Sequence, residues 1–333
     1  KPYSEWLSSQ LTTSLNVERW YAVLLVYKGL ENIKKRSRAV ALGNFDGVHI
    51  GHRELIIRAK ESAKIAGMKS AVFTFSNHPK NLMSAGKVKN ILYPEQKIKI
   101  MESFGVDYLF NIPFTEEICH MNPTDYVDKI LIEKFKMKEV YCGFNYRFGY
   151  KAEGNTQLLM NLSLSRGFGI HVMEPYKVGD QVVSSTLIRS LIKSGKLESC
   201  KNFLGRNYSI GGTVVVGKQN GRKFGFPTCN IVIDNTMITP PNGVYVTFCN
   251  IEDRRYPSIT NVGVKPTIGV FDKNIETHIF DIDENLYGKY INVEFLKKIR
   301  DEIKFDSVED LKKQISDDCI KVKAFHRRNR GEV

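Results

Sequence analysis

The stretch Gly43-Asn44-Phe45-Asp46-Gly47-Val48-His49-Ile50-Gly51-His52 decides how the first half of this chain folds. An apolar run at 39–42 precedes it and predicts a short buried strand, and residues 54–60 after it predict a helix. A strand, a glycine-bearing turn and a helix N-terminus form a phosphate site, because backbone N–H groups point outward and the helix dipole favours anions. The spacing of His49 and His52 puts both rings near one face of the first helical turn. Two imidazoles beside a phosphate suggest chemistry on a nucleotide.

Around this motif, apolar runs alternate with helical stretches. The predicted strands lie at 39–43, 70–75, 106–111, 138–142 and 168–173. The predicted helices lie at 51–66, 94–104, 123–135 and 154–165. Such alternation implies right-handed crossovers and a doubly wound parallel sheet, whose ligands bind outside the carboxyl ends of the strands. The opening motif lies at one such end.

After about residue 205 the pattern changes to short β-rich runs separated by turns. They lie at 208–216, 229–233, 243–250, 255–262, 275–282 and 290–297. This spacing predicts an antiparallel barrel or sandwich. A last amphipathic helix is expected at 307–317, with Ser307 as its N-cap. The predicted fold class is therefore α/β plus β.

These patterns divide the chain into four parts. Residues 1–20 form an extension without a clear period, 21–195 the α/β domain, 196–205 linker helices and 206–333 the β-rich domain. The length of 333 residues is enough for two domains.

The composition is that of an ordinary globular protein, with 42% apolar and 26% charged residues. No apolar run is long enough to span a bilayer and no secretory leader is visible, so we expect a cytoplasmic protein without a membrane partner. The six cysteines are widely spaced, without a zinc pattern, and are expected to be reduced core residues. The net charge of +13 fits either a polyanionic partner or a lysine-rich proteome, and the lysines form no dense block.

A second anion-binding candidate is Ser184-Ser185-Thr186-Leu187-Ile188-Arg189. Hydroxyl groups and helix N–H groups followed by a guanidinium can clamp a phosphate. The alternative is an ordinary capped helix with a solvated arginine.

A third candidate is Gly221-Arg222-Lys223-Phe224-Gly225-Phe226-Pro227-Thr228-Cys229-Asn230, which is glycine-rich, basic and aromatic and leads into a strand. Glycines permit close approach of the backbone to phosphates, and a threonine hydroxyl can ligate Mg²⁺. By itself this stretch is also compatible with a simple proline turn.

Together these motifs resemble the bacterial bifunctional riboflavin kinase/FMN adenylyltransferases, also called FAD synthetases. The first and second candidates resemble the nucleotidyltransferase half, as do Phe73-Thr74-Phe75-Ser76-Asn77-His78-Pro79 and Cys142-Gly143-Phe144-Asn145-Tyr146-Arg147-Phe148-Gly149. The third candidate and Glu276-Thr277-His278-Ile279-Phe280-Asp281 resemble the kinase half. The resemblance extends from about residue 27 to 318 and covers separate motifs in the expected order.

The resemblance implies roles for individual residues. It assigns His49 and His52 to the adenylyl phosphate site, and Glu276 to the general base of the kinase. The residues that it assigns to ATP or phosphate binding are Gly43, Asn44, Phe45, Asp46, Gly51, Ser185, Thr186, Arg189, Gly225, Pro227, Thr228 and Asn230. Thr228 would also ligate Mg²⁺. Asn145, Arg300 and Phe305 are the flavin candidates.

The implied activity is flavin cofactor synthesis. Riboflavin and ATP would give FMN in the C-terminal domain, and FMN with a second ATP would give FAD and pyrophosphate in the N-terminal domain. Both steps would need Mg²⁺. Two departures concern efficiency and metal handling: Ser76-Asn77 stand where the family commonly has Asp-Pro, and Leu187 stands where it often has arginine.

Two other functions remain open at this point. One is a related H-x-G-H nucleotidyltransferase for another phosphorylated metabolite, against which the Gly-Phe-Pro-Thr domain argues. The other is a nucleic-acid-binding protein, which the net charge of +13 would favour. We expect small-molecule partners and no nucleic acid, and the sequence leaves the oligomeric state open.

Overall fold

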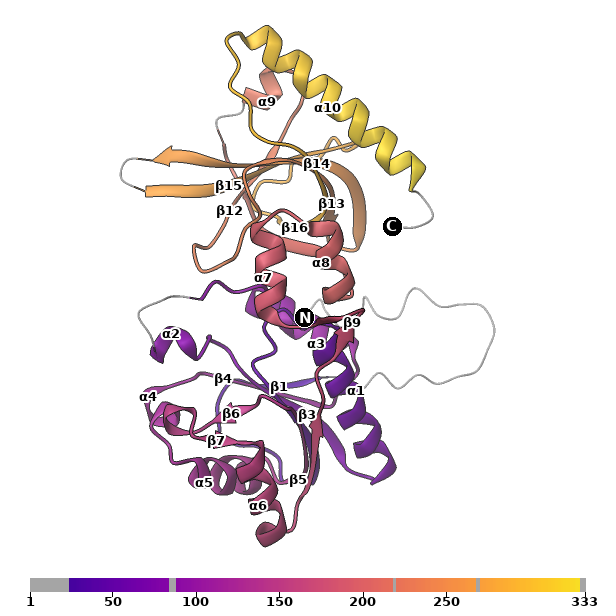
Figure 1. The fold of residues 1–333 in the computed structure, drawn as a ribbon. Coiled ribbons are helices and arrows are strands. Elements are labelled where there is room, and N and C mark those ends of the chain that lie inside the picture. The colour runs from indigo at the N-terminus through magenta and orange to yellow at the C-terminus, as the bar shows by residue number, and fades with distance from the viewer. Residues whose placement is uncertain (1–23, 84–87, 218–219, 268–269, 330–333) are drawn as a thin grey trace.

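The computed structural model describes residues 24–83, 88–217, 220–267 and 270–329. Within these ranges, an α/β unit lies at one end of the molecule and a β-barrel at the other, with two helices between them (Figure 1). The predicted extension at 1–20 lies outside the described residues. The predicted class, α/β plus β, is confirmed.

The α/β unit contains a six-stranded parallel sheet with the order β1-β4-β3-β2-β5-β8. Its strands are β1 (Leu25–Tyr27), β2 (Arg38–Leu42), β3 (Lys69–Phe75), β4 (Tyr108–Ile112), β5 (Met137–Gly143) and β8 (Gly169–Met173). The five predicted strands agree with β2, β3, β4, β5 and β8. Strand β1 was not predicted, because three residues on a half-exposed edge carry no readable alternation.

Helices cover both faces of this sheet. On one face, α1 (Ile50–Ile65) and α3 (Pro94–Ser103) bury Ile56 and Met101 against Ala39, Ala41 and their neighbours. On the other face, the π-helix η2 (Tyr126–Lys134) and α6 (Thr156–Arg166) pack against Val40 and Phe110. The predicted helices agree with these elements, and α5 (Pro123–Asp125) leads into η2.

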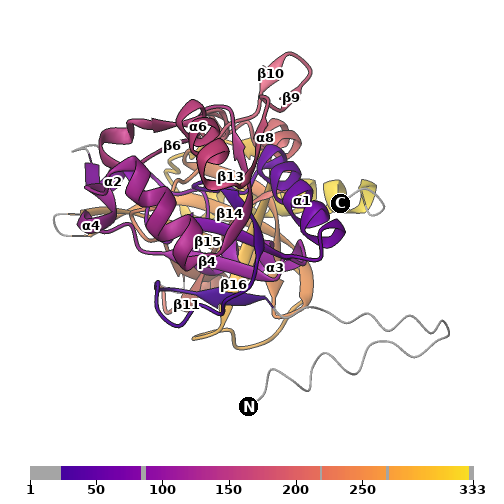
Figure 2. The same cartoon turned by 90° about the horizontal axis from the view of Figure 1, so that it is seen from below.

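Several short elements connect the larger ones. They are α2 (Lys80–Met83), α4 (Glu116–Cys119), η3 (Tyr150–Ala152) and the two-residue strands β6 (Arg147–Phe148), β7 (Gly154–Asn155), β9 (Lys177–Val178) and β10 (Gln181–Val182). Strands β9 and β10 form a small hairpin outside the main sheet, visible at one side in Figure 2.

The second half forms a closed barrel with the order β11-β12-β15-β14-β13-β16. Its antiparallel strands are β11 (Tyr208–Val215), β12 (Cys229–Val232), β13 (Gly243–Ile251), β14 (Arg254–Thr267), β15 (Val270–Ile279) and β16 (Tyr290–Arg300). All six β-rich runs of the sequence become barrel strands, and the short helix α9 (Asn220–Lys223) precedes β12. The barrel alternative is confirmed over the sandwich.

The C-terminal helix α10 (Val308–Arg328) begins as predicted but continues well beyond residue 317. The hydroxyl of Ser307 accepts a hydrogen bond from the backbone N–H of Asp310. The continuation is stabilised by Cys319, Val322 and His326, which are buried at helical spacing against the barrel. The predicted end was therefore too early, because charged residues between these positions interrupt the apolar stripe in the sequence.

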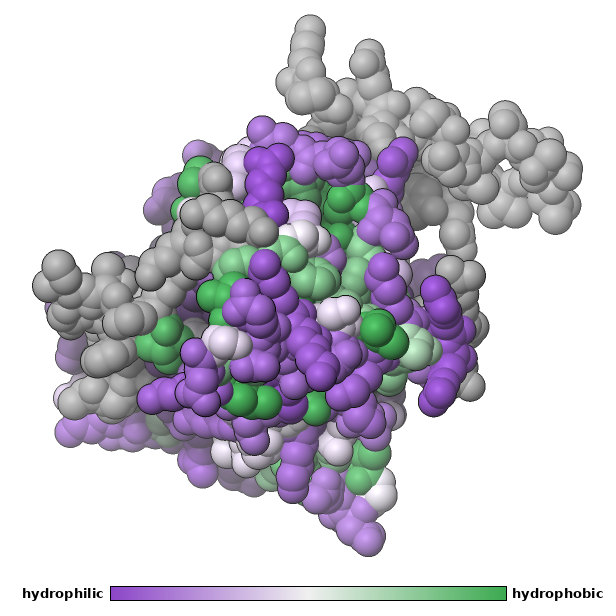
Figure 3. Space-filling model, turned by 90° about the horizontal axis from the view of Figure 1, so that it is seen from above, coloured by the Kyte–Doolittle hydropathy of each residue, from purple (hydrophilic) through white to green (hydrophobic). Residues whose placement is uncertain are grey.

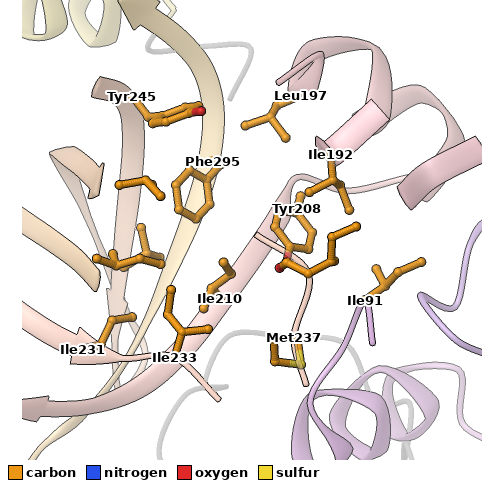
Figure 4. Packing of buried hydrophobic residues seen from close by; sticks show 14 of the residues in the cluster. Ile91, Ile192, Leu197, Tyr208, Ile210, Ile231, Ile233, Met237, Tyr245 and Phe295 are labelled. Atoms are coloured by element: carbon orange, nitrogen blue, oxygen red, sulfur yellow. The ribbon is translucent and has the colours of Figure 1, made fainter. Parts of the chain in front are cut away.

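One hydrophobic cluster joins the two halves. Helices α7 (Ser185–Lys193) and α8 (Leu197–Leu204) contribute Ile192 and Leu197 to the same cluster as Tyr208 and Phe295 of the barrel. Figure 4 shows Ile91, from the segment before α3, reaching into this cluster. The backbone of Asn90 pairs there with a barrel loop, since its N–H donates to Thr236 and its carbonyl accepts from Ile238.

The face of the molecule that is seen from above is mainly polar (Figure 3). Figure 3 shows the molecule from above with hydrophobic residues in small groups between hydrophilic ones. In the part of the chain that the structure describes, no helix has the length and apolarity to cross a membrane. The six cysteines are unpaired thiols, and four of them are core residues as predicted, whereas Cys119 and Cys229 are only partly buried.

Candidate active sites

The two motif histidines lie at the N-terminus of α1, at the carboxyl end of the central strand β2. His49 is the N-cap residue, and its Nδ1 accepts a hydrogen bond from the backbone N–H of His52 at 3.2 Å. The two rings stack with centroids 3.5 Å apart and planes 15° apart. Gly51 keeps this arrangement open, since a Cβ there would stand 3.1 Å from Tyr176 and 3.4 Å from the His49 ring.

Both imidazoles are held in the neutral form. Burial, with the positive charge of Arg206 acting in the same direction, lowers the pKa of His49 to about 4. Burial also lowers the pKa of His52 well below its usual value, with His49, Lys97 and Arg206 acting in the same direction. Because Nδ1 of neutral His49 accepts a hydrogen bond, its proton is on Nε2, which can donate to a phosphate oxygen.

The loop that enters α1 has a strained backbone. Phe45, Gly47 and Val48 have φ values of +45°, +84° and +40°. Positive φ is ordinary for glycine but costs about 1–3 kcal/mol for a residue such as valine. The loop therefore keeps its shape only because its surroundings impose it.

Asp46 links this loop to the second candidate motif. Its backbone carbonyl accepts a hydrogen bond from the Ser185 hydroxyl at 2.7 Å, and its carboxylate forms an ion pair with Arg189. The same carboxylate accepts from the backbone N–H of Ile91 at 3.0 Å. The structure thus brings the N-terminus of α7 to the first motif, while Thr186 is exposed on the first turn of α7.

A pocket opens at the carboxyl ends of β2 and β3. It is lined by Asn44, Asp46, Phe75, Ser76, Asn77, His78, Pro79, Asn90, Leu92, Pro94 and Lys97. His78, from the predicted His-Pro motif, lies here with its pKa lowered mainly by burial. Gly43 and the buried ring of Phe45 form the turn below, where a Cβ on Gly43 would stand 3.0 Å from that ring.

Lys97 is a candidate functional residue that we did not predict from the sequence. Its ammonium is buried at this pocket and donates to the carbonyls of Phe75 and Asn44 at 3.1 and 3.4 Å. Burial lowers the pKa of Lys97, and the charge of Asp46 opposes that shift. The available signal was a lysine four residues before Met101, on the apolar face of the helix beginning at Pro94.

The barrel brings together the predicted kinase residues. Asn230 on β12 lies opposite Glu276 on β15 in the antiparallel register. The amide nitrogen of Asn274 donates to Oδ1 of Asn230 at 3.1 Å and to Oε1 of Glu276 at 2.8 Å. Asn274 was also missed from the sequence. Its position two residues before Glu276 was the available signal, since such residues share one face of a strand.

The Gly-Phe-Pro-Thr turn leads directly into this cluster. Gly225 has a φ of +86°, and the carbonyl of the exposed Pro227 accepts a hydrogen bond from Nδ1 of His278 at 2.7 Å. A Cβ on Gly221 would stand 3.2 Å from the Thr228 hydroxyl, so the turn folds back closely on that oxygen.

Among the described residues, no group of three or more His, Cys, Asp or Glu side chains could hold a metal ion. Mg²⁺ at a nucleotide takes one or two hard oxygen ligands from a protein and the rest from phosphates and water. The hydroxyl of Thr228, close to Asn230 in the chain, is a donor of that kind.

The flavin candidates lie in two separate places. Asn145 is exposed in the turn after β5, at the same end of the sheet as His49. Arg300 ends β16, and its Nε donates to the buried carboxylate of Asp318 on α10 at 2.7 Å. Phe305 is partly buried in the segment between β16 and α10.

Comparison with known proteins matches both halves of the chain. Residues 31–187 match the family model for FAD synthetase, and residues 204–326 match that for riboflavin kinase. A bifunctional riboflavin kinase/FMN adenylyltransferase of Bacillus subtilis is 34% identical over 86% of this chain and 91% of its own length. That of Escherichia coli is 29% identical over 90% and 96%.

A solved structure from Streptococcus pneumoniae, described as a macrolide-efflux protein, shares the architecture with a TM-score of 0.81. It is 28% identical and covers 90% of this chain and 99% of its own.

The fold and the two constellations define a two-domain transferase, with a nucleotide-binding parallel sheet and a kinase barrel. The chain belongs to the family of bifunctional riboflavin kinase/FMN adenylyltransferases. A nucleotidyltransferase for another metabolite is not favoured, because the riboflavin kinase match covers the whole barrel.

Proposed function

We propose that this chain makes FAD from riboflavin in two ATP-dependent steps. The observation that carries the proposal is that one chain holds both constellations, each within the domain of the matching family. We assign the first domain to residues 21–195 and the second to 206–333, with residues 196–205 as the link between them. The substrates are riboflavin, FMN and ATP.

In the barrel, the 5′-hydroxyl of riboflavin attacks the γ-phosphorus of ATP. Glu276 takes the hydroxyl proton, the phosphoryl group moves to the ribityl oxygen, and ADP leaves. Asn274 holds the Glu276 carboxylate through the hydrogen bond at 2.8 Å. Gly225, Pro227, Thr228 and Asn230 surround the nucleotide, and Arg300 and Phe305 border the flavin. Thr228 would hold Mg²⁺, which when bound offsets the negative charge of the phosphates.

In the α/β domain, an oxygen of the FMN phosphate attacks the α-phosphorus of a second ATP. A new P–O–P bond forms, the bond to the β-phosphate breaks, and pyrophosphate leaves. FMN needs little help from a base here, since its phosphate is already an anion at neutral pH. His49 and His52 instead donate hydrogen bonds to the α-phosphate oxygens as charge develops on them.

Some of the remaining predicted residues contact the substrates, and others position the residues that do. Ser185, Thr186 and Arg189 lie on the triphosphate side, and Asn145 contacts the flavin. The ion pair between Asp46 and Arg189 supports a positioning role for the carboxylate. We therefore propose that Asp46 orients Arg189 while the backbone of Gly43, Asn44 and Phe45 faces the nucleotide.

Separation of flavins after incubation with riboflavin, ATP and Mg²⁺ tests the proposal. We expect FMN to appear first and FAD to follow, with neither formed when ATP is omitted. A chain that consumes no riboflavin and converts no supplied FMN would contradict the proposal.

Replacing Asn274 by alanine is expected to slow FMN formation about tenfold, because Glu276 and Asn230 lose the amide that holds both. FAD formation from supplied FMN should stay unchanged. Asn250→Ala is the matched control, since Asn250 donates an equivalent hydrogen bond to Glu294 at 2.6 Å elsewhere in the barrel. The measurement is the steady-state rate of each half-reaction in the parent chain and in both variants. Equal effects of the two substitutions on the kinase would rule out a special role for Asn274.

A further inference from the structure

Arg206 connects the barrel half of the chain to the strained loop of the adenylyl site. It follows Gly205, which ends α8 with a φ of +75°, and precedes β11 by two positions. Its guanidinium donates to the carbonyl of Gly47 at 2.6 Å and to that of Val48 at 2.9 Å. These carbonyls belong to the two residues that come directly before His49.

The partners of this half-buried guanidinium are backbone oxygen atoms. Among the described residues, its hydrogen bonds go to backbone carbonyls, the third being that of Leu204 at 3.4 Å. Burial lowers the pKa of Arg206 to about 10. A desolvated cation is costly unless its surroundings are arranged for it. The arrangement here is a pair of carbonyls turned toward one fork-shaped donor.

The two hydrogen bonds act where the backbone is least favourable. Gly47 and Val48 both have positive φ values, and a β-branched residue rarely adopts such a conformation. Because Arg206 binds the carbonyls of both residues, it fixes the direction in which the chain enters the N-cap at His49. Burial is the main cause that lowers the pKa of both imidazoles; the charge of this guanidinium acts in the same direction on both, and that of Lys97 on His52.

We propose that Arg206 is a positioning residue of the adenylyl-transfer site, supplied by the segment that begins the barrel half. It shapes the 47–48 turn and so aims His49 at the α-phosphate. This inference rests on the proposed function for its effect on FAD formation. It means that the kinase half completes the adenylyl site of the other half.

Arg206→Met in the full chain removes both the pair of hydrogen bonds to the carbonyls of Gly47 and Val48 and the positive charge. We expect FAD formation from supplied FMN to fall about tenfold or more in kcat, because small misplacements of a catalytic group are costly. FMN formation from riboflavin should stay within about twofold of the parent rate, which also reports that the variant is folded. Lys201→Met is the matched control, because it removes one positive charge from the exposed side of α8 nearby.

The pH dependence separates positioning from general destabilisation. Removal of the Arg206 charge should raise the pKa of His49, so that the acid limb of FAD formation moves to higher pH in Arg206→Met. Arg206→Lys keeps the positive charge but not the planar guanidinium that binds two carbonyls at once. We expect it to have the pH profile of the parent chain and a kcat between those of the parent chain and Arg206→Met. Added guanidinium should partly restore FAD formation by Arg206→Ala. Unchanged kcat and pH profile in folded Arg206→Met would overturn the proposal.

Titration of the His49 ring by NMR gives a readout without turnover. The expected result is a higher pKa for His49 in Arg206→Met than in the parent chain, whereas Lys201→Met leaves it unchanged. If the parent chain forms no FAD, the proposed function fails, but this comparison still decides whether Arg206 controls the histidine. Identical titration curves in the parent and Arg206→Met would overturn that role.

Discussion

Glu276→Gln should abolish FMN formation by this chain and leave FAD formation from supplied FMN intact. The ribityl hydroxyl is a weak nucleophile, and a positioned base contributes roughly 10²–10⁴-fold to such a step. Glutamine keeps the size of the side chain but cannot accept the proton. Glu276 lies opposite Asn230 and accepts a hydrogen bond from Asn274. The substitution therefore removes a base whose position is fixed by its neighbours.

The internal control for Glu276→Gln is the other half-reaction in the same tube, because a misfolded chain would lose both. Asp253→Asn, in the exposed turn after β13, matches the loss of one negative charge. The measurement is the rate of each half-reaction, followed by chromatography of the flavins, with riboflavin and FMN supplied as separate substrates. Kinase activity within a few fold of the parent chain would remove Glu276 from the role of base.

The double variant His49→Asn with His52→Asn should produce the opposite pattern. FAD formation should fall by at least about 10²-fold, the cost typical of losing one transition-state hydrogen-bond donor, while FMN continues to accumulate from riboflavin. Asparagine is chosen at position 49 because the His49 side chain also caps α1. An N-cap lost to alanine would cost about 1 kcal/mol of stability and confuse the result, whereas asparagine is a good cap.

The single variants distinguish the two rings. His49 has its Nε2 proton free to donate because Nδ1 is used by the cap, so His49→Asn alone should lower kcat more than it raises KM. A double variant that loses both half-reactions while remaining folded would show that the two sites are not separate. A double variant that retains FAD synthesis would remove the histidines from the chemistry.

Much of the fold could be predicted because its elements are periodic and bounded by turn residues. The strand at β3 and the helix at α3 follow from an apolar run and from Pro94 at a helix start. The barrel strands follow in the same way, since alternation and turns are local properties. Strand β1 and the second half of α10 were missed because a short edge strand and a charged helix show little local contrast.

The residues of the candidate sites could be predicted only where they belong to a recognisable sequence motif. His49, His52, Thr228 and Glu276 belong to such motifs. Lys97 and Asn274 do not, because a lysine in a helix and an asparagine in a strand are common, and only their partners make them notable. Phe75 lies 22 positions from Lys97, and Asn230 lies 44 positions from Asn274, separations that no local pattern spans.

The sequence by itself determined the order of strands and helices, the split into α/β and β halves, and the family. These follow from periodicity, turn residues and short motifs, which act over a few positions of the chain. Only the tertiary structure decided that Asp46 pairs with Arg189 and that Arg206 reaches back to the carbonyls of Gly47 and Val48. Such contacts join residues more than 140 positions apart. They depend on how the halves pack, because a buried polar group must find its partners wherever the fold places them.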